Sequence, residues 1–272
     1  MGSGIAQVAA SAGFNTILYE LNDSALQNAK GKIQKDVQKL VEKQKITQQK
    51  ADNLLHQLHF TNTLSDCVAD VVIEAIIEKL EAKLSLFNQL SEVNGNETIF
   101  ASNTSSLSIT KLAQNVIHPE RVIGMHFFNP APLMKLVEVV TTNYTNERIT
   151  KIIIDLTRQM GKEPVVCKDS PGFIVNRVAR PFYIESFRIA EERTVEIETI
   201  DRLLESKGFK LGPFKLMDLI GNDINYAVSC SVYEQLNNPE RLKPSYMQKE
   251  KVEKNELGKK SGKGYYDYTP SP

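Results

Sequence analysis

The sequence predicts an α/β fold, a doubly wound sheet that lacks its first strand, followed by an all-α domain. Three observations lead to this prediction. β-Branched runs alternate with helical apolar periods from the N-terminus to about residue 168, as in sheets whose strands are joined by helices. From residue 169 onward helical periods continue without a convincing strand. The chain of 272 residues is also long enough for two modest domains, so we predict domains at 1–168 and 169–272.

The chain opens on Met1-Gly2-Ser3-Gly4 and continues as an apolar helix to Gly13. This is typical of the second half of a Gly-x-Gly-x-x-Gly turn that binds dinucleotides, with Gly2 in the place of the third glycine. The strand and the two glycines that normally come first are not in this sequence. We therefore expect weaker dinucleotide binding and exposed sheet edges in these 272 residues.

The remaining elements follow from the spacing of apolar residues. Asn15–Glu20 is predicted as a short strand, and two amphipathic helices at about 24–58 form an insertion. Further strands are predicted at 70–76, 98–103, 121–128, 135–141 and 163–167, with helices at 80–93 and 109–116. Helices are then predicted at 177–192, bent at Pro181, and at 200–206, 215–220 and 224–236.

Composition excludes several classes of protein. Lysine and arginine total 33, as do aspartate and glutamate, so no overall field favours nucleic acid or a membrane surface. Cys67, Cys167 and Cys230 are far apart, which predicts reduced thiols without disulfides or a metal site. No apolar run reaches the ~18 residues of a membrane helix, and residues 1–15 lack the basic region of a secretory signal. We predict a cytoplasmic protein.

Glu20 ends the strand that follows the glycine turn, 18 positions after Gly2. An acid at this spacing accepts hydrogen bonds from the ribose hydroxyls of adenosine and repels a 2′-phosphate. The alternative is an ordinary surface glutamate at a strand end. The spacing favours the cofactor role and predicts NAD over NADP.

His126 stands near the end of an apolar strand, where open α/β sheets place their ligands. Glu138 lies in the next apolar strand, and burial would penalise its carboxylate strongly unless it were paired. A buried glutamate beside a buried histidine prepares a general base, although a purely structural pair is the competing interpretation. The remaining histidines are predicted to be unpaired surface residues: His56, His59 and His118.

Other polar residues follow the predicted strands. Ser102–Ser106 would either cap the next helix or bind a ligand, and capping does not account for all five residues. Glu78 and Lys83 would touch the cofactor ribose or lie exposed at a helix start, with nothing in the sequence to decide between the two. Asn176 begins the second domain, where it would reach a cleft or merely cap its helix.

Several long motifs closely resemble the L-3-hydroxyacyl-CoA dehydrogenase family, including bacterial 3-hydroxybutyryl-CoA dehydrogenases. The motifs are Ala101–Ser108, Gly124–Val140, Lys168–Arg177, Leu211–Phe214, Asp218–Gly221 and Gly258–Tyr268. The resemblance covers nearly the whole chain. It implies a Rossmann-type domain, a helical domain that dimerises and contributes to substrate binding, and an active site in the cleft.

The resemblance also implies the roles of individual residues and a reversible reaction between 3-hydroxyacyl-CoA and 3-oxoacyl-CoA with NAD. The catalytic set would be His126 as base with Glu138, Ser105 and Asn176; Gly2, Glu20, Glu78, Lys83, Ser105 and Asn129 would face NAD. The family's reaction serves fatty acid β-oxidation in one direction and butanoate synthesis in the other.

Two other interpretations compete with this one. The first is a catalytically silent protein that binds CoA esters or forms dimers after losing its cofactor site. The second is a dehydrogenase of a different hydroxy acid, which the serine cluster and the His126–Pro130 motif argue against.

Overall fold

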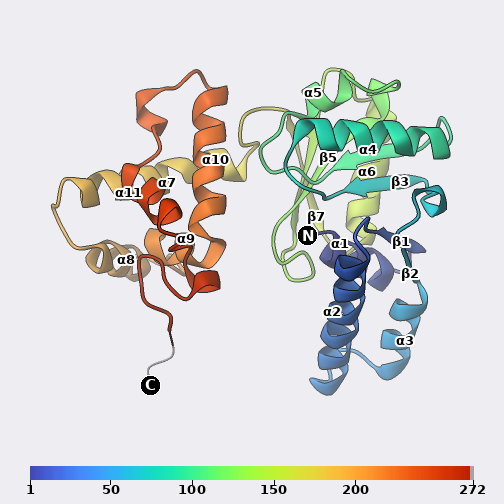
Figure 1. The fold of residues 1–272 in the computed structure, drawn as a ribbon, viewed down its shortest axis with the longest axis horizontal. Helices are drawn as coiled ribbons and strands as arrows, with labels where there is room; N and C mark the ends of the chain where they lie inside the picture. The colour runs from blue at the N-terminus through green and yellow to red at the C-terminus, as the bar shows by residue number, and fades with distance from the viewer. Residues whose placement is uncertain (270–272) are drawn as a thin grey trace. The chain divides into compact units, whose positions relative to one another are not determined.

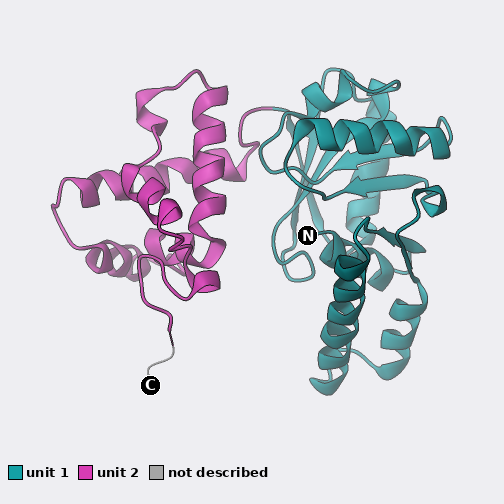
Figure 2. Ribbon diagram, in the orientation of Figure 1, with its two compact units in different colours: residues 1–169 teal, residues 170–272 magenta. Residues whose placement is uncertain are grey.

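A computed structural model describes residues 1–269. Figures 1 and 2 show that the chain forms two compact units, which we call unit 1 (residues 1–169) and unit 2 (residues 170–272). Unit 1 contains the strands, and unit 2 is helical. No helix within the described part of the chain is long and apolar enough to cross a membrane.

The strands of unit 1 form two sheets rather than one. They are β1 (Thr16–Tyr19), β2 (Leu58–Thr61), β3 (Val71–Glu74), β4 (Ile99–Ser102), β5 (Val122–Phe127), β6 (Leu136–Thr141) and β7 (Glu163–Lys168). β1 and β2 pair in parallel, and the second sheet has the order β3-β4-β5-β6-β7. Within residues 1–269, β1 pairs only with β2, and β3 pairs only with β4, so each sheet keeps an open edge at these strands.

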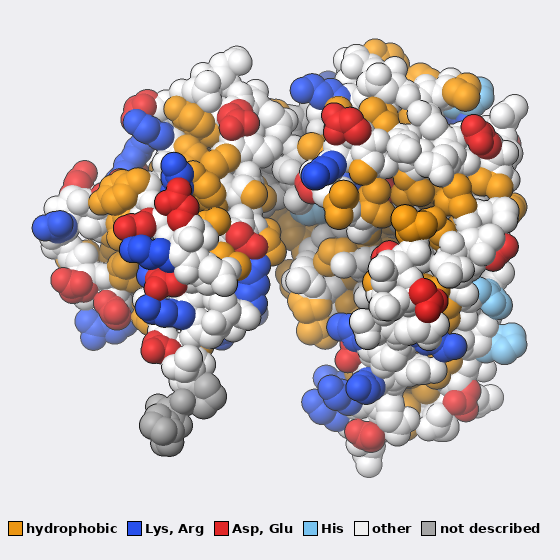
Figure 3. Space-filling view, in the orientation of Figure 1, with side chains coloured by type: hydrophobic (Ala, Val, Ile, Leu, Met, Phe, Trp, Pro, Cys, Tyr) orange, Lys and Arg blue, Asp and Glu red, His pale blue; other side chains and the backbone are white. Residues whose placement is uncertain are grey.

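Apolar side chains are exposed beside the open edge of β3. Val68 is 63% exposed and Ile77 is 62% exposed, on either side of this short strand. Figure 3 shows hydrophobic side chains gathered across this face of unit 1.

The helices of unit 1 cover both faces of the larger sheet. They are α1 (Gly2–Ser11), α2 (Asp23–Glu42), α3 (Gln48–His56), α4 (Leu80–Val93), α5 (Ile109–Ala113) and α6 (Glu147–Gln159). Ile5 of α1 and Ile153 of α6 share a core with Ala101 of β4. The neighbouring Phe100 points to the other face, where its ring centroid lies 5.3 Å from that of Phe87 in α4.

α2 and α3 form a separate core with the smaller sheet. Ile33 and Val37 of α2 pack with Leu54 of α3 and with Leu18 of β1. α1 contributes to both cores, because Ile5 lies in the larger one while Ala6 lies in this one. The glycine-led helix therefore joins the two sheets.

Unit 2 consists of helices around an aromatic core. They are α7 (Val175–Glu191), α8 (Ile197–Ser206), α9 (Pro213–Ile220), α10 (Asn222–Gln235) and α11 (Tyr246–Glu253). Phe187 and Phe214 are buried at its centre, with ring centroids 5.4 Å apart and nearly perpendicular. Between residues 170 and 269 the backbone forms isolated bridges but no strand.

The predicted fold class, a Rossmann-type α/β sheet followed by an all-α unit, is confirmed. Three details differ. Leu58 belongs to β2 and not to the preceding helix, and α6 and α11 were not predicted at all. β6 runs antiparallel to β5, because residues 128–135 are too few for the helical crossover that a parallel pair requires.

Candidate active site

His126 and Glu138 lie opposite each other on the antiparallel strands β5 and β6. Nδ1 of His126 is 2.7 Å from Oε2 of Glu138, and the two residues are only 6% and 0% exposed. Gly124 permits this close pairing of strands, because a Cβ at that position would lie 2.7 Å from Cβ of Val140. The strands therefore hold an imidazole against a carboxylate inside the sheet. Such a contact fixes the tautomer and the orientation of the ring.

The end of β5 is anchored to the segment that follows β4. Oδ1 of Asn103 accepts a hydrogen bond from the backbone N–H of Phe127, 2.8 Å away. The ring of Phe128 lies beside that of His126, with centroids 4.6 Å apart. These contacts restrict the backbone of Phe127 and the ring of His126 at the C-terminal end of β5.

A second buried charge cluster forms where β3 and β4 end. Nζ of Lys83 lies 2.6 Å from Oε1 of Glu74, and the two side chains are 1% and 0% exposed. The other carboxylate oxygen of Glu74 accepts a hydrogen bond of 2.6 Å from Oγ of Ser102. The backbone N–H of Ile76 also donates to Glu74. Both charges are thus paired and hydrogen-bonded, which burial requires.

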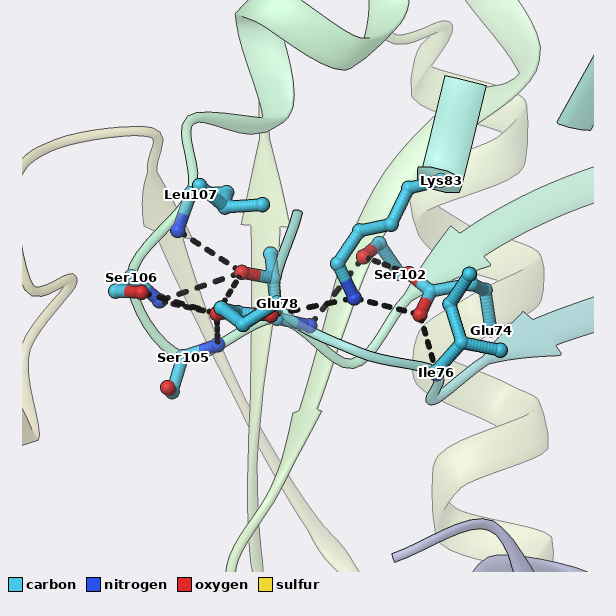
Figure 4. A network of polar contacts seen from close by, with 9 residues as sticks. Glu74, Ile76, Glu78, Lys83, Ser102, Ser105, Ser106 and Leu107 are labelled. Atoms are coloured by element: carbon cyan, nitrogen blue, oxygen red, sulfur yellow. Dashed lines mark hydrogen bonds and ion pairs between the residues drawn. The ribbon is translucent and has the colours of Figure 1, made fainter. Parts of the chain in front are cut away.

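Glu78 extends this cluster toward the surface, as Figure 4 shows. Its Oε2 lies 3.2 Å from Nζ of Lys83, and its Oε1 accepts hydrogen bonds from Oγ1 of Thr104 and Oγ of Ser106. Backbone N–H groups of Ser105 and Ser106 donate to the same oxygen. Burial alone would raise the pKa of Glu78, but the hydrogen bonds from Thr104 and Ser106 together with the charge of Lys83 outweigh it, and the pKa is lowered.

The serine cluster therefore does not cap the helix that follows. The N-cap of α5 is Ser108, whose side chain accepts from the backbone N–H of Lys111. Ser102, Thr104 and Ser106 instead bind the carboxylates of Glu74 and Glu78. Figure 4 shows the hydroxyl of Ser105 turned away from Glu78.

Lys83 and Glu78 occupy different environments, although the sequence offered the same two alternatives for both. Lys83 is one of the most buried side chains of unit 1, and its Nζ is already paired with Glu74 and Glu78, whereas the side chain of Glu78 is 37% exposed. Glu74 was missed by the sequence analysis. Like Glu138, Glu74 is a carboxylate inside an apolar strand, and such a residue needs a partner when it is buried. The same sequence signal therefore identifies Glu74.

The start of α1 and the end of β1 suit a dinucleotide. Met1 is the N-cap of α1, its side chain makes no capping hydrogen bond, and no acid occupies the first turn. A Cβ on Gly2 would meet nothing closer than Cβ of Ala75 at 4.0 Å. The N–H of Gly4 already donates to the carbonyl of Met1, so within residues 1–269 the N–H groups of Gly2 and Ser3 are those of this turn left to meet an anion such as a pyrophosphate. Glu20 directly follows β1, half-buried, and its Oε1 accepts a hydrogen bond from the backbone N–H of Asn22.

Two further predicted residues stand at the ends of other elements. Asn129 is exposed directly after β5, and a cis peptide bond joins it to Pro130. Asn176 lies in the first turn of α7 in unit 2. The prediction that His118 is unpaired is wrong, because its Nδ1 lies 3.2 Å from Oε1 of Glu120. No group of residues with metal-binding geometry occurs within residues 1–269.

Comparison with family models assigns the two parts of the chain to one enzyme family. Residues 1–170 match the model described as 3-hydroxyacyl-CoA dehydrogenase, NAD binding domain. Residues 172–268 match the model of the C-terminal domain of the same family. The cofactor indicated for the first part is therefore NAD.

Individual relatives agree with this assignment. The chain is 46% identical over 270 residues to 3-hydroxyadipyl-CoA dehydrogenase of Escherichia coli K12, which covers 98% of the chain and 57% of that relative. It is 39% identical over 270 residues to a probable 3-hydroxybutyryl-CoA dehydrogenase of Deinococcus radiodurans, covering 98% of the chain and 96% of the relative. A crystal structure of 3-hydroxybutyryl-CoA dehydrogenase from Escherichia coli K12 superimposes with a TM-score of 0.96 at 45% identity, covering 100% of this chain and 58% of that one. The chain thus spans little more than half the length of the Escherichia coli proteins.

Proposed function

Because the chain belongs to the 3-hydroxyacyl-CoA dehydrogenase family, we propose that it interconverts 3-hydroxyacyl-CoA and 3-oxoacyl-CoA with His126 as the general base. The observation that carries this proposal is the buried pair of His126 and Glu138, with 2.7 Å between Nδ1 and Oε2. Two relatives are named for 3-hydroxybutyryl-CoA and 3-hydroxyadipyl-CoA. Short acyl chains such as 3-hydroxybutyryl and acetoacetyl are therefore the first substrates to test.

The proton moves through the imidazole. Nδ1 of His126 is committed to Glu138, so Nε2 is the nitrogen that takes the proton of the substrate hydroxyl. Glu138 stabilises the imidazolium that results and keeps the ring in one orientation. In the reverse direction the same nitrogen returns the proton to the oxygen at C3. Bound NAD would supply the acceptor for the hydride that leaves C3 in the forward direction.

Three groups of unit 1 would hold the cofactor. The first turn of α1 at Gly2 would take the pyrophosphate, and Glu20 would accept the ribose hydroxyls. Glu78 and Asn129, both partly or fully exposed, would contact the nicotinamide half, together with Ser105. Lys83 would act through Glu78, since its ammonium group is already paired with Glu74 and Glu78.

Unit 2 would supply Asn176 for the oxygen at C3 and would form a homodimer. Apolar side chains on three of its helices support an interface, because Val178, Leu219 and Ile224 are 73%, 52% and 49% exposed.

The test is acetoacetyl-CoA-dependent oxidation of NADH, with His126→Gln beside the unmodified chain. Loss of the base should lower kcat by about 10²–10⁴-fold and leave the Kd for acetoacetyl-CoA nearly unchanged. His118→Gln, which alters a half-buried histidine that also contacts a glutamate, Glu120, is the matched control. Turnover of His126→Gln close to that of the unmodified chain would remove His126 from the mechanism.

The same assay separates catalysis from cofactor binding. A variant extended at its N-terminus by a β-strand and a Gly-x-Gly turn offers a partner to the open edges of β1 and β3. If only the extended variant oxidises NADH, the lack of turnover in the unmodified chain results from weak NAD binding. Binding of acetoacetyl-CoA without turnover in either form would instead support the silent CoA-ester-binding interpretation.

A further inference from the structure

Arg180 of α7 is a buried cation without an acidic partner. The residue is 2% exposed, and it takes part in no ion pair within residues 1–269. Its guanidinium is held only by neutral acceptors: Nε donates to the backbone carbonyl of Asn176, and Nη1 donates to Oγ of Ser229 and the carbonyl of Asn225. Nη2 makes no hydrogen bond to any of the described residues.

This arrangement is costly for a protein that never binds an anion there. Burying a charge is unfavourable unless it is paired, and arginine is almost never fully buried without a carboxylate. Arg121, the other buried arginine among the described residues, is likewise held by backbone carbonyls and an aromatic ring, but the nearby charges of Glu120 and Glu97 partly offset the effect of burial on its pKa. Burial lowers the pKa of Arg180 to about 10, with the ring of Tyr183 partly offsetting the effect, so the side chain is still charged at neutral pH.

Arg180 also lies next to the residue proposed to contact the reacting end of the substrate. Asn176 and Arg180 are four positions apart on α7, so they share one face, about one helical turn apart. Side chains tilt toward the N-terminus of their helix, which places the guanidinium over the turn that begins at Asn176. The hydrogen bond from Nε to the Asn176 carbonyl fixes it there at 2.9 Å.

We propose that Arg180 binds the terminal carboxylate of a dicarboxylic acyl chain, and so selects 3-hydroxyacyl-CoA substrates that end in a carboxylate. The inference rests on the proposed function, because Asn176 marks the position of C3. An acyl chain that continues a few carbons beyond C3 spans a distance comparable to the turn between Asn176 and Arg180. The N–H groups of Nη2 are left for a ligand, and a guanidinium N–H makes a strong, charge-assisted hydrogen bond to a carboxylate oxygen.

Ser229 and Asn225 position the guanidinium for this role. They lie on α10, are 3% and 2% exposed, and occupy Nη1. Nη2 is therefore the nitrogen that would donate to a ligand carboxylate. A substrate with a methyl group in place of the carboxylate would leave the charge unpaired, which is the situation that gives enzymes their largest discrimination.

The experiment compares two substrates of equal length, 3-hydroxyadipyl-CoA and 3-hydroxyhexanoyl-CoA, with NAD. For the unmodified protein we expect kcat/KM to be about 100-fold higher for the adipyl substrate. In Arg180→Met this ratio should collapse to within a few-fold of one, mainly through KM for the adipyl substrate. Arg180→Lys should retain part of the preference, and Arg188→Met, which alters a half-exposed arginine of the same helix, should retain all of it.

A purely structural role for Arg180 would lower activity on both substrates equally and leave their ratio unchanged. That result, or a ratio near one in the unmodified protein, would overturn the proposal. Should Arg180→Met fail to fold, the ratio in the unmodified protein and in Arg180→Lys still decides.

A binding measurement keeps this inference separate from the proposed function. Calorimetry with the unreactive esters adipyl-CoA and hexanoyl-CoA measures the preference without NAD or turnover. Tighter binding of adipyl-CoA supports the role of Arg180 even if no oxidation of NADH is found. Activity on acetoacetyl-CoA with equal binding of the two esters would overturn the role of Arg180 alone.

Discussion

Both units bury carboxylates, but they satisfy them in different ways. In unit 1 the buried carboxylates are paired with ionisable side chains, Glu138 with His126 and Glu74 with Lys83. In unit 2 the buried carboxylate of Asp218 accepts hydrogen bonds from the backbone N–H groups of Tyr265 and Tyr266. Asp201 likewise accepts from backbone N–H groups at the start of α9, and uncharged side chains complete both sites, the hydroxyl of Tyr266 at Asp201 and the amide of Asn222 at Asp218.

We infer from this difference that the buried carboxylates of unit 2 stabilise the fold, whereas those of unit 1 can take part in chemistry. Backbone amides cannot change their charge or move away, so Asp201 and Asp218 act as fixed anchors that tie the C-terminal segment to α8 and α9. Two glycines are required around them, because a Cβ on Gly212 or Gly264 would lie 2.3 or 2.0 Å from a carboxylate oxygen. A carboxylate paired with an imidazole or an ammonium group, in contrast, can tune a proton or orient a loop.

The largest effect that tests this comparison is the loss of an anchor in unit 2. In Asp218→Asn an amide N–H₂ would face a backbone donor at one of the two oxygen positions, and a buried hydrogen bond would be lost. We expect the free energy of unfolding to fall by about 2–4 kcal/mol, measured by urea unfolding with circular dichroism.

The control for this variant is Asp267→Asn. Asp267 lies in the same segment but is exposed, and its partners are local groups of Thr269. Its unfolding curve should overlay that of the unmodified protein. If Asp218→Asn overlays it too, the backbone anchors do not stabilise unit 2 and the comparison fails.

A carboxylate that is neither paired nor anchored should influence binding rather than folding. Glu20 receives a hydrogen bond from the backbone N–H of Asn22 and is the residue that we propose to bind the cofactor ribose. In Glu20→Ala we expect KM for NADH to rise by about 10–100-fold through loss of charge-assisted hydrogen bonds, with little change for NADPH. Glu81→Ala, an exposed acid at the start of α4, should change neither constant. A lower KM for NADPH than for NADH in the unmodified chain would contradict the role of Glu20.

Much of this could be predicted from the sequence because the relevant signals are local. The apolar run around His126 and the acid inside the next apolar strand together predicted a buried pair, and the structure places them 2.7 Å apart. The helix boundaries at Leu80 and Val93 also agree with the structure, since the apolar period is regular between them.

The errors arose where the local signal was weak or where a role depended on distant residues. Leu58 fits both a helical stripe and a strand, and only pairing with β1 assigns it to β2. The partners of Lys83 come from β3 and from the segment after it, so its burial could not be read from α4 alone. The partners of Arg180, Asn225 and Ser229, similarly lie on α10, so its burial could not be predicted from the sequence of α7 alone.

The smallest predicted effect concerns Glu78, which stands between the two kinds of carboxylate because backbone N–H groups and Lys83 both contact it. Its pKa in the folded protein is below the ordinary value of 4.5, so the folded state binds this proton less readily than the unfolded state. The stabilisation is therefore complete above pH 4.5 and is lost as the pH falls through the lowered value. Since the side chain is 37% exposed, solvent screening limits the effect to a few tenths of a kcal/mol. Unfolding of the unmodified protein and of Glu78→Gln, measured from neutral pH down to acid, should show a difference that shrinks only in this acidic range. A difference that stays constant over the whole range would mean that the contacts of Glu78 do not depend on its charge, and that it belongs with the anchors of unit 2.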